Sequence, residues 1–258
     1  MKRIVTVVLA LMFLLAGVSC GEEKGVIQAI ESRGVVRIGV KTDVPGFGYY
    51  NPDTGIYEGM EIDLARAVAK ALLGSEQAVE FFGVTPQTRG PMLQNGEIDL
   101  VIATFTITEE RLKSFRFTNP YYQDEIGLLV RRDSGIESLS GLGGKTVGVG
   151  QSSTAQSTLL AEAESMGVAL SMLEFPSYPE LKAALVAGKI DAFAVDKSIL
   201  YGYVDDMTVI LAEGFNPQDY GIATALENTQ LAVALNDLLS AMTRDGRMAE
   251  LMARWGLQ

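Results

Sequence analysis

The feature that most constrains the fold is an alternation of strand and helix patterns in the first hundred residues. Val35–Val40 has the pattern of a buried strand, and Val79–Val84 and Leu100–Ala103 are predicted to be the next two strands. Ile62–Leu73 has the apolar spacing of a helix, and Gly74 can end it. With a further helix before the last strand, the order implies a mainly parallel sheet with helices on its faces. The sequence therefore predicts an α/β fold.

The further helix is predicted between the last two of these strands. Thr85-Pro86 can cap its start, with the proline in the first turn, and Asn95-Gly96 can end it. Arg89 then lies in the first turn, where the helix dipole disfavours a cation. This position indicates an anionic partner for Arg89, and a solvated arginine is the alternative.

The second half of the chain repeats the plan of the first. Gln94–Asp99 (QNGEID) has a counterpart in Val186–Asp191 (VAGKID), at an offset of 92 residues. Likewise, Arg37–Val40 (RIGV) is matched by Thr146–Val149 (TVGV). Chance similarity between two α/β segments is one interpretation. The other, which we adopt, is that the chain forms two small α/β lobes of similar plan with a ligand cleft between them.

The domain boundaries follow from this repeat. Arg131–Gly135 (RRDSG) is the expected first crossing between lobes, and Tyr220–Thr224 is the expected return. The helices predicted in Thr229–Trp255 have no counterpart in the second unit, so we expect them to pack on the first lobe. The predicted organisation is lobe 1 from residues 26–130 and 221–258, and lobe 2 from residues 131–220.

The composition excludes several chemistries. The chain has no histidine and one cysteine, so a histidine-based triad, histidine metal ligation, a CxxC redox pair and an internal disulfide are impossible. The formal net charge is −11, and it becomes −13 without the first twenty residues, which hold two of the 21 basic residues and none of the 32 acidic ones. Nucleic acid repels such a protein. We expect no nucleic-acid partner, no metal and no cofactor.

The N-terminal residues have the pattern of an export signal. Met1–Arg3 is basic, and Ile4–Val18 is an apolar stretch interrupted only by Thr6. This stretch is too short to be a good membrane span. We therefore expect residues 1–19 to be a signal peptide.

The single cysteine follows directly after small residues. Ala16–Cys20 (AGVSC) resembles a bacterial lipobox, with Gly17 at the place usually held by leucine. Cleavage at a lipobox leaves the cysteine as the first residue, with lipid on its sulfur. An ordinary signal peptide with an incidental cysteine is the alternative. Residues 20–25 are then expected to form a short polar tether. We expect the protein to be exported and held at a membrane through Cys20.

Polar residues gather where the predicted strands end, and open α/β sheets bind ligands at that edge. They are Lys41, Thr104–Thr108, Gly150–Thr154 and Asp196. Thr104 and Asp196 occupy the same place in the two repeated units. A carboxylate at the end of an apolar strand needs a cation as partner, and a helix N-cap is the alternative role for Asp196.

Two of these segments are suited to bind an anion. Thr108 can cap a short helix that holds Arg111, where hydroxyls, backbone N–H groups and a guanidinium converge. Gly148–Thr154 offers hydroxyls before another helix N-terminus. A carboxylate is the anion that this arrangement fits, and a capped helix with a solvated arginine is the alternative.

Three motifs resemble the family 3 extracellular solute-binding proteins, the polar amino-acid receptors of ABC importers. Gly59–Leu72 is similar to the family signature, with Met60 where Phe or Tyr is usual. Ile102–Arg111 and Phe117–Tyr122 are close to its most recognisable stretch. The resemblance extends from about Val26 to Gln258. It implies the type II periplasmic-binding-protein fold, which has two α/β lobes joined by two crossing strands.

The resemblance also implies how an amino-acid head group is bound. Arg111 matches the arginine that binds the ligand α-carboxylate, with help from Thr106, Ser153 and Thr154. Thr104 and Asp196 match positions that take the α-ammonium.

Further positions imply contacts with the ligand side chain. Phe47 falls in the turn where an aromatic residue often covers the ligand. Lys41, Arg89 and Tyr178 match positions that meet the side-chain carboxylate in receptors for acidic amino acids. Ala155, where some members place a polar contact, and the Met60 substitution are departures that bear on the choice of ligand.

The functional expectation is an extracytoplasmic, lipid-anchored receptor of an amino-acid ABC importer. It would bind glutamate or aspartate by closing its lobes, act as a monomer with a permease and its ATPase, and catalyse nothing. Glutamine or another polar amino acid is the alternative ligand. A dehydratase of cyclohexadienyl acids on the same fold and a module that signals ligand occupancy are the alternative classes.

Overall fold

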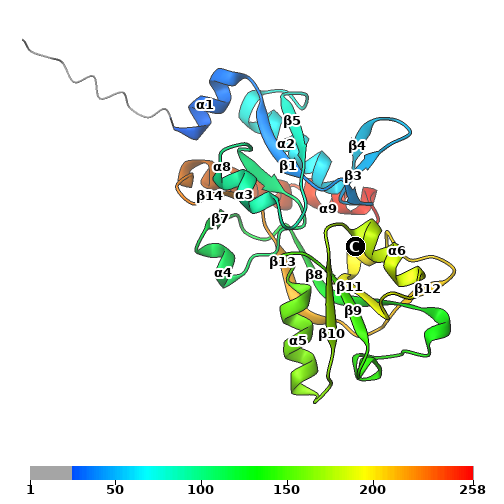
Figure 1. Cartoon of the computed structure of the whole chain (residues 1–258). Coiled ribbons are helices and arrows are strands. Elements are labelled where there is room, and N and C mark those ends of the chain that lie inside the picture. Colours follow the sequence, from blue (N-terminus) through cyan, green and yellow to red (C-terminus); the bar gives the residue numbers. More distant parts are fainter. Residues whose placement is uncertain (1–24, 258) are drawn as a thin grey trace, which may run out of the picture.

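Two separate β-sheets form the centres of two lobes, which the chain connects twice (Figure 1). The structure is a computed structural model, and it describes residues 25–257. The predicted signal peptide, Cys20 and most of the tether lie outside the described residues. No helix in the range 25–257 is long and apolar enough to cross a membrane.

The sheet of lobe 1 has the strand order β5-β1-β6-β14-β7. Its strands are β1 Val36–Val40, β5 Val79–Gly83, β6 Leu100–Ile102, β7 Phe115–Phe117 and β14 Ala223–Ala225. β1 pairs in parallel with β5 and β6, as the sequence predicts, and β14 runs antiparallel to β6 and β7. Because both faces of the sheet are covered, all three residues of β6 are buried, and so are all residues of β1 except the partly exposed Arg37.

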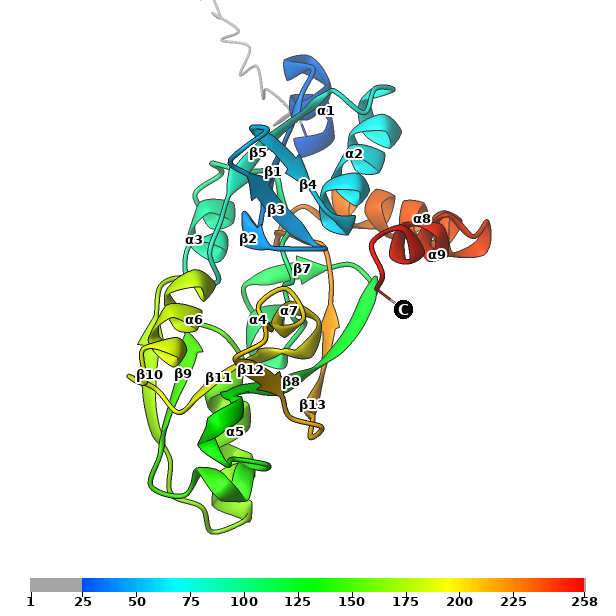
Figure 2. The same ribbon diagram turned by 90° about the vertical axis from the view of Figure 1, so that its right-hand side faces the viewer.

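Helices cover the sheet of lobe 1. They are α1 Val26–Arg33, α2 Met60–Leu73, α3 Arg89–Gln94, α4 Glu109–Leu112, α8 Thr229–Arg244 and α9 Arg247–Arg254. α2 ends at Gly74, which has the left-handed conformation with φ 78°. The C-terminal α8 and α9 pack against α2, so they belong to lobe 1 as predicted (Figure 2).

The start of α3 differs from the prediction. The helix begins at Arg89 rather than after Thr85-Pro86, and its N-cap residue is Thr88. The side chains of Thr85 and Thr88 accept hydrogen bonds from each other's backbone N–H groups, at 3.2 and 3.0 Å. Thr85 also accepts the Arg89 N–H at its carbonyl, at 3.1 Å, so it makes the hydrogen bonds expected of a cap to the turn that leads into the helix.

The sheet of lobe 2 has the order β10-β9-β11-β8-β12, and β13 also pairs with β8. Its strands are β8 Tyr122–Arg131, β9 Thr146–Gly150, β10 Ser171–Phe175, β11 Ala192–Asp196, β12 Thr208–Ile210 and β13 Phe215–Tyr220. Its helices are α5 Ala155–Ser165, α6 Tyr178–Val186, α7 Lys197–Leu200 and the 3₁₀ turns η1 Arg132–Ser134 and η2 Leu139–Leu142. The order β10-β9-β11 repeats β5-β1-β6 of lobe 1, so the repeat in the sequence is a repeat of structure.

The first crossing lies earlier than predicted. β8 pairs antiparallel with β11, β12 and β13, so it belongs to lobe 2, and the chain leaves lobe 1 between Phe117 and Tyr122 rather than at Arg131. The apolar run of β8 has the pattern of any buried strand, and that pattern does not reveal which sheet the strand joins.

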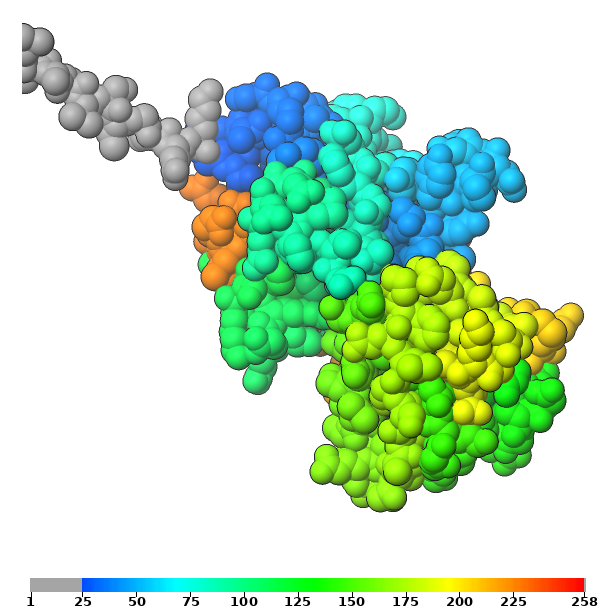
Figure 3. All heavy atoms as spheres, in the orientation of Figure 1, coloured from blue at the N-terminus to red at the C-terminus, as the bar shows by residue number. Residues whose placement is uncertain are grey.

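The two connections lie side by side. Thr118 N–H donates to Ile222 C=O at 3.0 Å, and Tyr121 N–H donates to Tyr220 C=O at 2.9 Å. β13 ends at Tyr220 and β14 begins at Ala223, so the chain returns to lobe 1 there. Lobe 1 also carries a small sheet of β2 Asp43–Val44, β3 Gly48–Asn51 and β4 Ile56–Glu58, and atoms of lobe 2 touch lobe 1 beneath it (Figure 3).

Candidate functional site

A small cavity lies between the lobes, at the carboxyl ends of β6, β9 and β11. It is lined by Arg89, Thr104, Thr106, Ile126, Ser153, Thr154, Ala155, Tyr178, Val195 and Asp196. Most of the residues predicted for the site are among them. The cavity volume is about 10 Å³, room for about one water molecule. The lobes must therefore separate before anything as large as an amino acid can enter.

Arg111 lies at the edge of this cavity, on α4. Thr108 caps α4 as predicted, because its side chain accepts a hydrogen bond from the Arg111 N–H at 3.2 Å. The guanidinium donates to Thr106 C=O at 2.8 Å and, across the cleft, to Ser152 C=O at 3.2 Å. Burial and the nearby Arg89 lower the pKa of Arg111 to about 9. Its bonds to carbonyls leave the guanidinium charge without a carboxylate, which an anionic ligand group can supply.

Unpartnered polar atoms from both lobes face this region. Among the described residues, Thr104 Oγ1, Ser153 Oγ and Asp196 Oδ1 are buried and have no hydrogen-bond partner. Thr154 differs, because its hydroxyl donates to Gln218 Oε1 at 2.7 Å. Buried polar groups are normally paired. The three atoms therefore mark where a polar ligand gains hydrogen bonds.

Asp196 combines a strand end with a helix start. It ends β11 and is the N-cap residue of α7, but its side chain makes no cap hydrogen bond. Instead, Asp196 Oδ2 accepts from the Tyr220 hydroxyl at 2.5 Å, and Tyr220 also donates to Asp124 at 3.3 Å. Burial and the charge of Asp124 raise the pKa of Asp196 to about 7. A bound ammonium group would stabilise the ionised form.

Arg89 lies behind Thr104 and is buried. Its Nη1 donates to Ala103 C=O at 2.6 Å and to Thr104 C=O at 3.1 Å. Its guanidinium stands 4.0 Å from the centre of the Phe105 ring. Burial lowers the pKa of Arg89, while the charge of Asp196 raises it. Arg89 therefore lies at the cavity, and it forms no direct salt bridge with a carboxylate of the described residues.

Lys41 and Phe47 lie next to the cavity rather than along its wall. Lys41 Nζ is 2.9 Å from Asp43 Oδ1 and 4.6 Å from the centre of the Tyr178 ring. Tyr178 N–H donates to Asp43 Oδ2 at 3.4 Å. Phe47 is fully buried, 6.0 Å from the Tyr220 ring. Lys41 therefore already has a carboxylate partner. Phe47 packs against Tyr220, whose hydroxyl donates to Asp196.

Glu61 is a residue of this region that the sequence analysis missed. It lies in the first turn of α2, is 0 % exposed, and accepts hydrogen bonds from Thr104 N–H at 2.6 Å and the Tyr121 hydroxyl at 2.5 Å. Burial raises the pKa of Glu61 to about 7. A signal was present, because Glu61 stands between the apolar residues Met60 and Ile62, and all three are buried.

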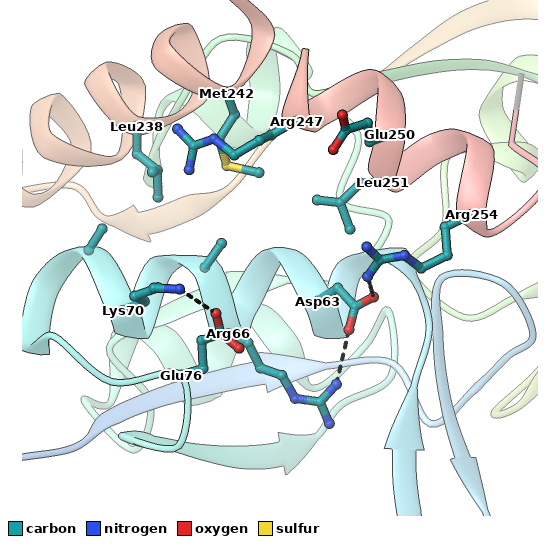
Figure 4. A pocket seen from close by; sticks show the side chains of 12 residues that line it. Asp63, Arg66, Lys70, Glu76, Leu238, Met242, Arg247, Glu250, Leu251 and Arg254 are labelled. Carbon is teal, nitrogen blue, oxygen red and sulfur yellow. Dashed lines mark hydrogen bonds and ion pairs between the residues drawn. The ribbon is translucent and has the colours of Figure 1, made fainter. Parts of the chain in front are cut away.

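A second hollow, on the outer face of lobe 1, offers no comparable chemistry. It lies between α2 and the helices α8 and α9 (Figure 4). Asp63 pairs with Arg66 and Arg254, at 3.0 and 3.2 Å, and Lys70 pairs with Glu76 at 2.8 Å. These charges satisfy one another. The described part of the chain also holds no group of three acidic or cysteine side chains that could bind a metal.

Two α/β lobes with a polar cleft between them, approached by an arginine from one side and a carboxylate from the other, define a solute-binding protein. The chain belongs to the bacterial extracellular solute-binding proteins, family 3, whose family model matches residues 36–258. It is an amino-acid-binding component of an ABC transporter and works outside the cytoplasm, as members of this family do.

Individual relatives agree with this assignment. The chain is 38% identical over 272 residues to the ABC transporter glutamine-binding protein GlnH of Bacillus subtilis, covering 99% of this chain and 97% of the relative. It is 31% identical over 252 residues to the glutamate-binding protein GluB of Corynebacterium efficiens, covering 90% and 84%. Among solved structures, the ancestral amino-acid-binding protein AncCDT-1, a precursor of cyclohexadienyl dehydratase, superposes with a TM-score of 0.80 at 29% identity, covering 90% of this chain and 99% of that one.

Proposed function

We propose that the protein is a receptor for glutamine, which it captures by closing its two lobes. The observation that carries this proposal is the balance of charge around the cleft. Three cations, Lys41, Arg89 and Arg111, lie around it together with four carboxylates, Asp43, Glu61, Asp124 and Asp196. Because buried charges require pairing, a site without surplus positive charge offers no spare cation to a second ligand carboxylate and so favours a ligand of zero net charge. Glutamine is such a zwitterion. Its side-chain amide can form hydrogen bonds with polar groups of the cleft that the head group leaves free.

The head group of the ligand would be bound by residues at the two ends of the cleft. Arg111 would bind the α-carboxylate, with Thr106, Ser153 and Thr154 beside it. Thr104 Oγ1 and Asp196 Oδ1, both unpartnered, would accept hydrogen bonds from the α-ammonium. This assignment supports an α-amino acid as the ligand class, whatever its side chain.

Acidic amino acids are the competing ligands expected from the sequence. That expectation depends on two cations, Lys41 and Arg89, being free to meet a second carboxylate. The 2.9 Å contact of Lys41 with Asp43 supports the neutral ligand instead, because it leaves Arg89 alone for that role. The similarity to the glutamine-binding protein of Bacillus subtilis supports the same ligand.

Calorimetric titration of glutamine, glutamate and arginine tests the proposal. We expect glutamine to bind most tightly, and a preference for glutamate would contradict the neutral-ligand assignment. Removing one partner of a buried charge pair costs about 2–5 kcal/mol, so Arg111→Ala and Asp196→Ala should each lose at least about thirtyfold in affinity. Arg132→Ala, an exposed arginine on lobe 2, is the control and should bind as the wild type does.

A catalytic role is the second candidate, because Asp196 has a pKa of about 7 and is suited to transfer protons near neutral pH. The likeness to a precursor of a dehydratase adds to this interest. We propose binding without turnover, since the family model and the relatives named above are those of solute-binding proteins. Incubation with cyclohexadienyl acids, followed by absorbance of the aromatic product, decides between the two, and product formation abolished by Asp196→Asn would establish the enzyme.

A further inference from the structure

Glu61 is connected to the ligand site by a hydrogen bond with one cavity residue, Thr104. Its Oε1 accepts two hydrogen bonds, from the Thr104 N–H and from the Tyr121 hydroxyl, while Oε2 is buried and has no partner. Thr104 lines the cavity and Glu61 does not. Any effect of Glu61 on the ligand therefore passes through its neighbours.

Thr104 adopts a conformation that needs support. Its φ is +44°, in the left-handed region that β-branched residues rarely occupy. Both ends of the residue are held, because Glu61 accepts from its N–H at 2.6 Å and Arg89 donates to its C=O at 3.1 Å. Such strained residues cluster at functional sites, where the surroundings impose them. Glu61 and Arg89 together hold Thr104 at the cavity wall.

We propose that Glu61 is a positioning residue that holds Thr104 toward the ligand, and that it takes up a proton when the ligand brings a second carboxylate. The inference rests on the proposed function, in which an amino acid binds between the lobes. It adds a means by which one site distinguishes glutamine from glutamate, and by which glutamate becomes acceptable at lower pH.

The physical reason lies in the charges that face Glu61. Arg89 from α3 and Lys41 after β1 stabilise its ionised form, as do the Tyr121 hydroxyl and the Thr104 N–H, while burial opposes ionisation and leaves the pKa at about 7. Asp63 on the same helix is paired with Arg66 and Arg254 instead. A ligand carboxylate near Arg89 would reduce the electrostatic stabilisation that Arg89 gives to the ionised form of Glu61. The pKa of Glu61 then rises, and a proton from solvent binds to the free Oε2.

Proton uptake can be counted by calorimetry at pH 7.5, in two buffers that differ in ionisation enthalpy. For the wild type, we expect more protons taken up per glutamate than per glutamine, with a difference of up to about 0.75, because a carboxyl of pKa about 7 is already about a quarter protonated at this pH. Asp196 contributes equally to both, because the ammonium that it meets is common to the two ligands. Glutamate affinity should accordingly rise as pH falls toward 7, by up to about tenfold per pH unit.

Three variants test whether Glu61 is the group that binds the proton taken up with glutamate. Glu61→Gln cannot ionise, so the difference between the two ligands should disappear. Tyr121→Phe retains the carboxylate but loses one hydrogen bond that favours its ionised form, so the midpoint of the pH dependence should move to higher pH. Asp63→Asn, the neighbouring acidic residue of α2, is the matched control and should retain the wild-type difference.

The outcomes separate this inference from the proposed function. If the wild type binds neither glutamine nor glutamate, both proposals are wrong. If it binds glutamine but takes up equal numbers of protons with the two ligands, only the role of Glu61 is wrong. A difference that persists in Glu61→Gln, or a midpoint that does not move in Tyr121→Phe, also overturns it, and the second variant remains informative if the first does not fold.

Discussion

Burial distinguishes two carboxylates at the cleft from the acidic side chains of the surface. Asp196 and Glu61 are 5 % and 0 % exposed, and the pKa of each is raised to about 7. In the unfolded chain their pKa values return to the ordinary range, so the folded state binds protons that the unfolded state has lost. The contribution of these groups to stability is therefore present at low pH and is lost as pH rises from about 4 to about 7.

Asp196→Asn tests this at one residue. Asparagine carries no charge, so the variant escapes the cost of ionising a buried carboxylate at high pH. Relative to the wild type without ligand, its free energy of unfolding should increase between pH 5 and pH 8 by on the order of 2 kcal/mol. This corresponds to a Tm difference of about 4–8 °C for a domain of this size. Thermal unfolding at several pH values measures it, with exposed Asp206→Asn as control, and a pH-independent Tm difference would contradict the buried charge.

At the scale of elements, the start of α2 is joined to a turn that supports the cleft. Gly59 precedes α2 with φ 130°, and a Cβ atom there would lie 2.0 Å from the carbonyl oxygen of Phe47. Glu61 N–H donates to the same carbonyl at 3.0 Å. The turn that holds Phe47 and the helix that holds Glu61 are thus docked by a backbone contact that only glycine permits.

Gly59→Ala should therefore destabilise the protein far more than an ordinary glycine substitution. Urea denaturation should show a loss of more than about 3 kcal/mol, since both the backbone conformation and the contact with Phe47 must change. Gly74→Ala is the matched control. Gly74 also has a positive φ, but its added Cβ meets nothing within 4 Å, so only the conformational cost of about 1–2 kcal/mol is expected. Equal losses in the two variants would argue against the docking role.

At the scale of the whole molecule, contacts across the cleft hold the lobes together. Arg111 of lobe 1 donates to Ser152 of lobe 2, and Asp43 of lobe 1 accepts from the Tyr178 backbone and the Tyr203 hydroxyl of lobe 2. Opening breaks these few contacts, while the paired connections beside Tyr220 remain. A rigid-body hinge at those connections is the simplest motion that admits a ligand.

Small-angle X-ray scattering should show this motion. We expect the radius of gyration to fall when saturating glutamine is added, because the ligand links the two lobes. The Arg111→Ala variant, which should bind weakly, should show no decrease at the same concentration. The forward-scattered intensity should correspond to one chain in both states. An unchanged profile in the presence of proven binding would exclude lobe closure.

The expected membrane anchor is also a property of the whole molecule. Cys20→Ser should move the protein from the membrane to the soluble fraction, because serine cannot receive the lipid. Ser19→Ala retains the cysteine and a small residue before it, so this control should stay membrane-bound. Fractionation with immunodetection measures the distribution, and a membrane-bound Cys20→Ser variant would show that another feature anchors the protein.

Local pattern was sufficient to predict the class of fold and many of the residues that line the cavity. Strand and helix periodicity identified β1, α2, β5 and β6, and the repeat at an offset of 92 residues indicated two similar lobes. Thr108 was recognised as a cap because capping depends on a few adjacent residues. These inferences succeed because the interactions behind them lie within a few residues of one another in the chain.

Tertiary structure decided what depends on partners far away in the chain. β8 joins lobe 2 through pairing with β11 and β13, although its apolar pattern fits either sheet. Lys41 lies against the ring of Tyr178 from the other lobe, and Glu61 meets Thr104, 43 positions further along the chain. Burial, which sets the charge of each group, is a property of the packed lobes. The sequence by itself therefore determined the α/β architecture and the segments that reach the cleft, while only packing decided which charges remain free to meet a ligand.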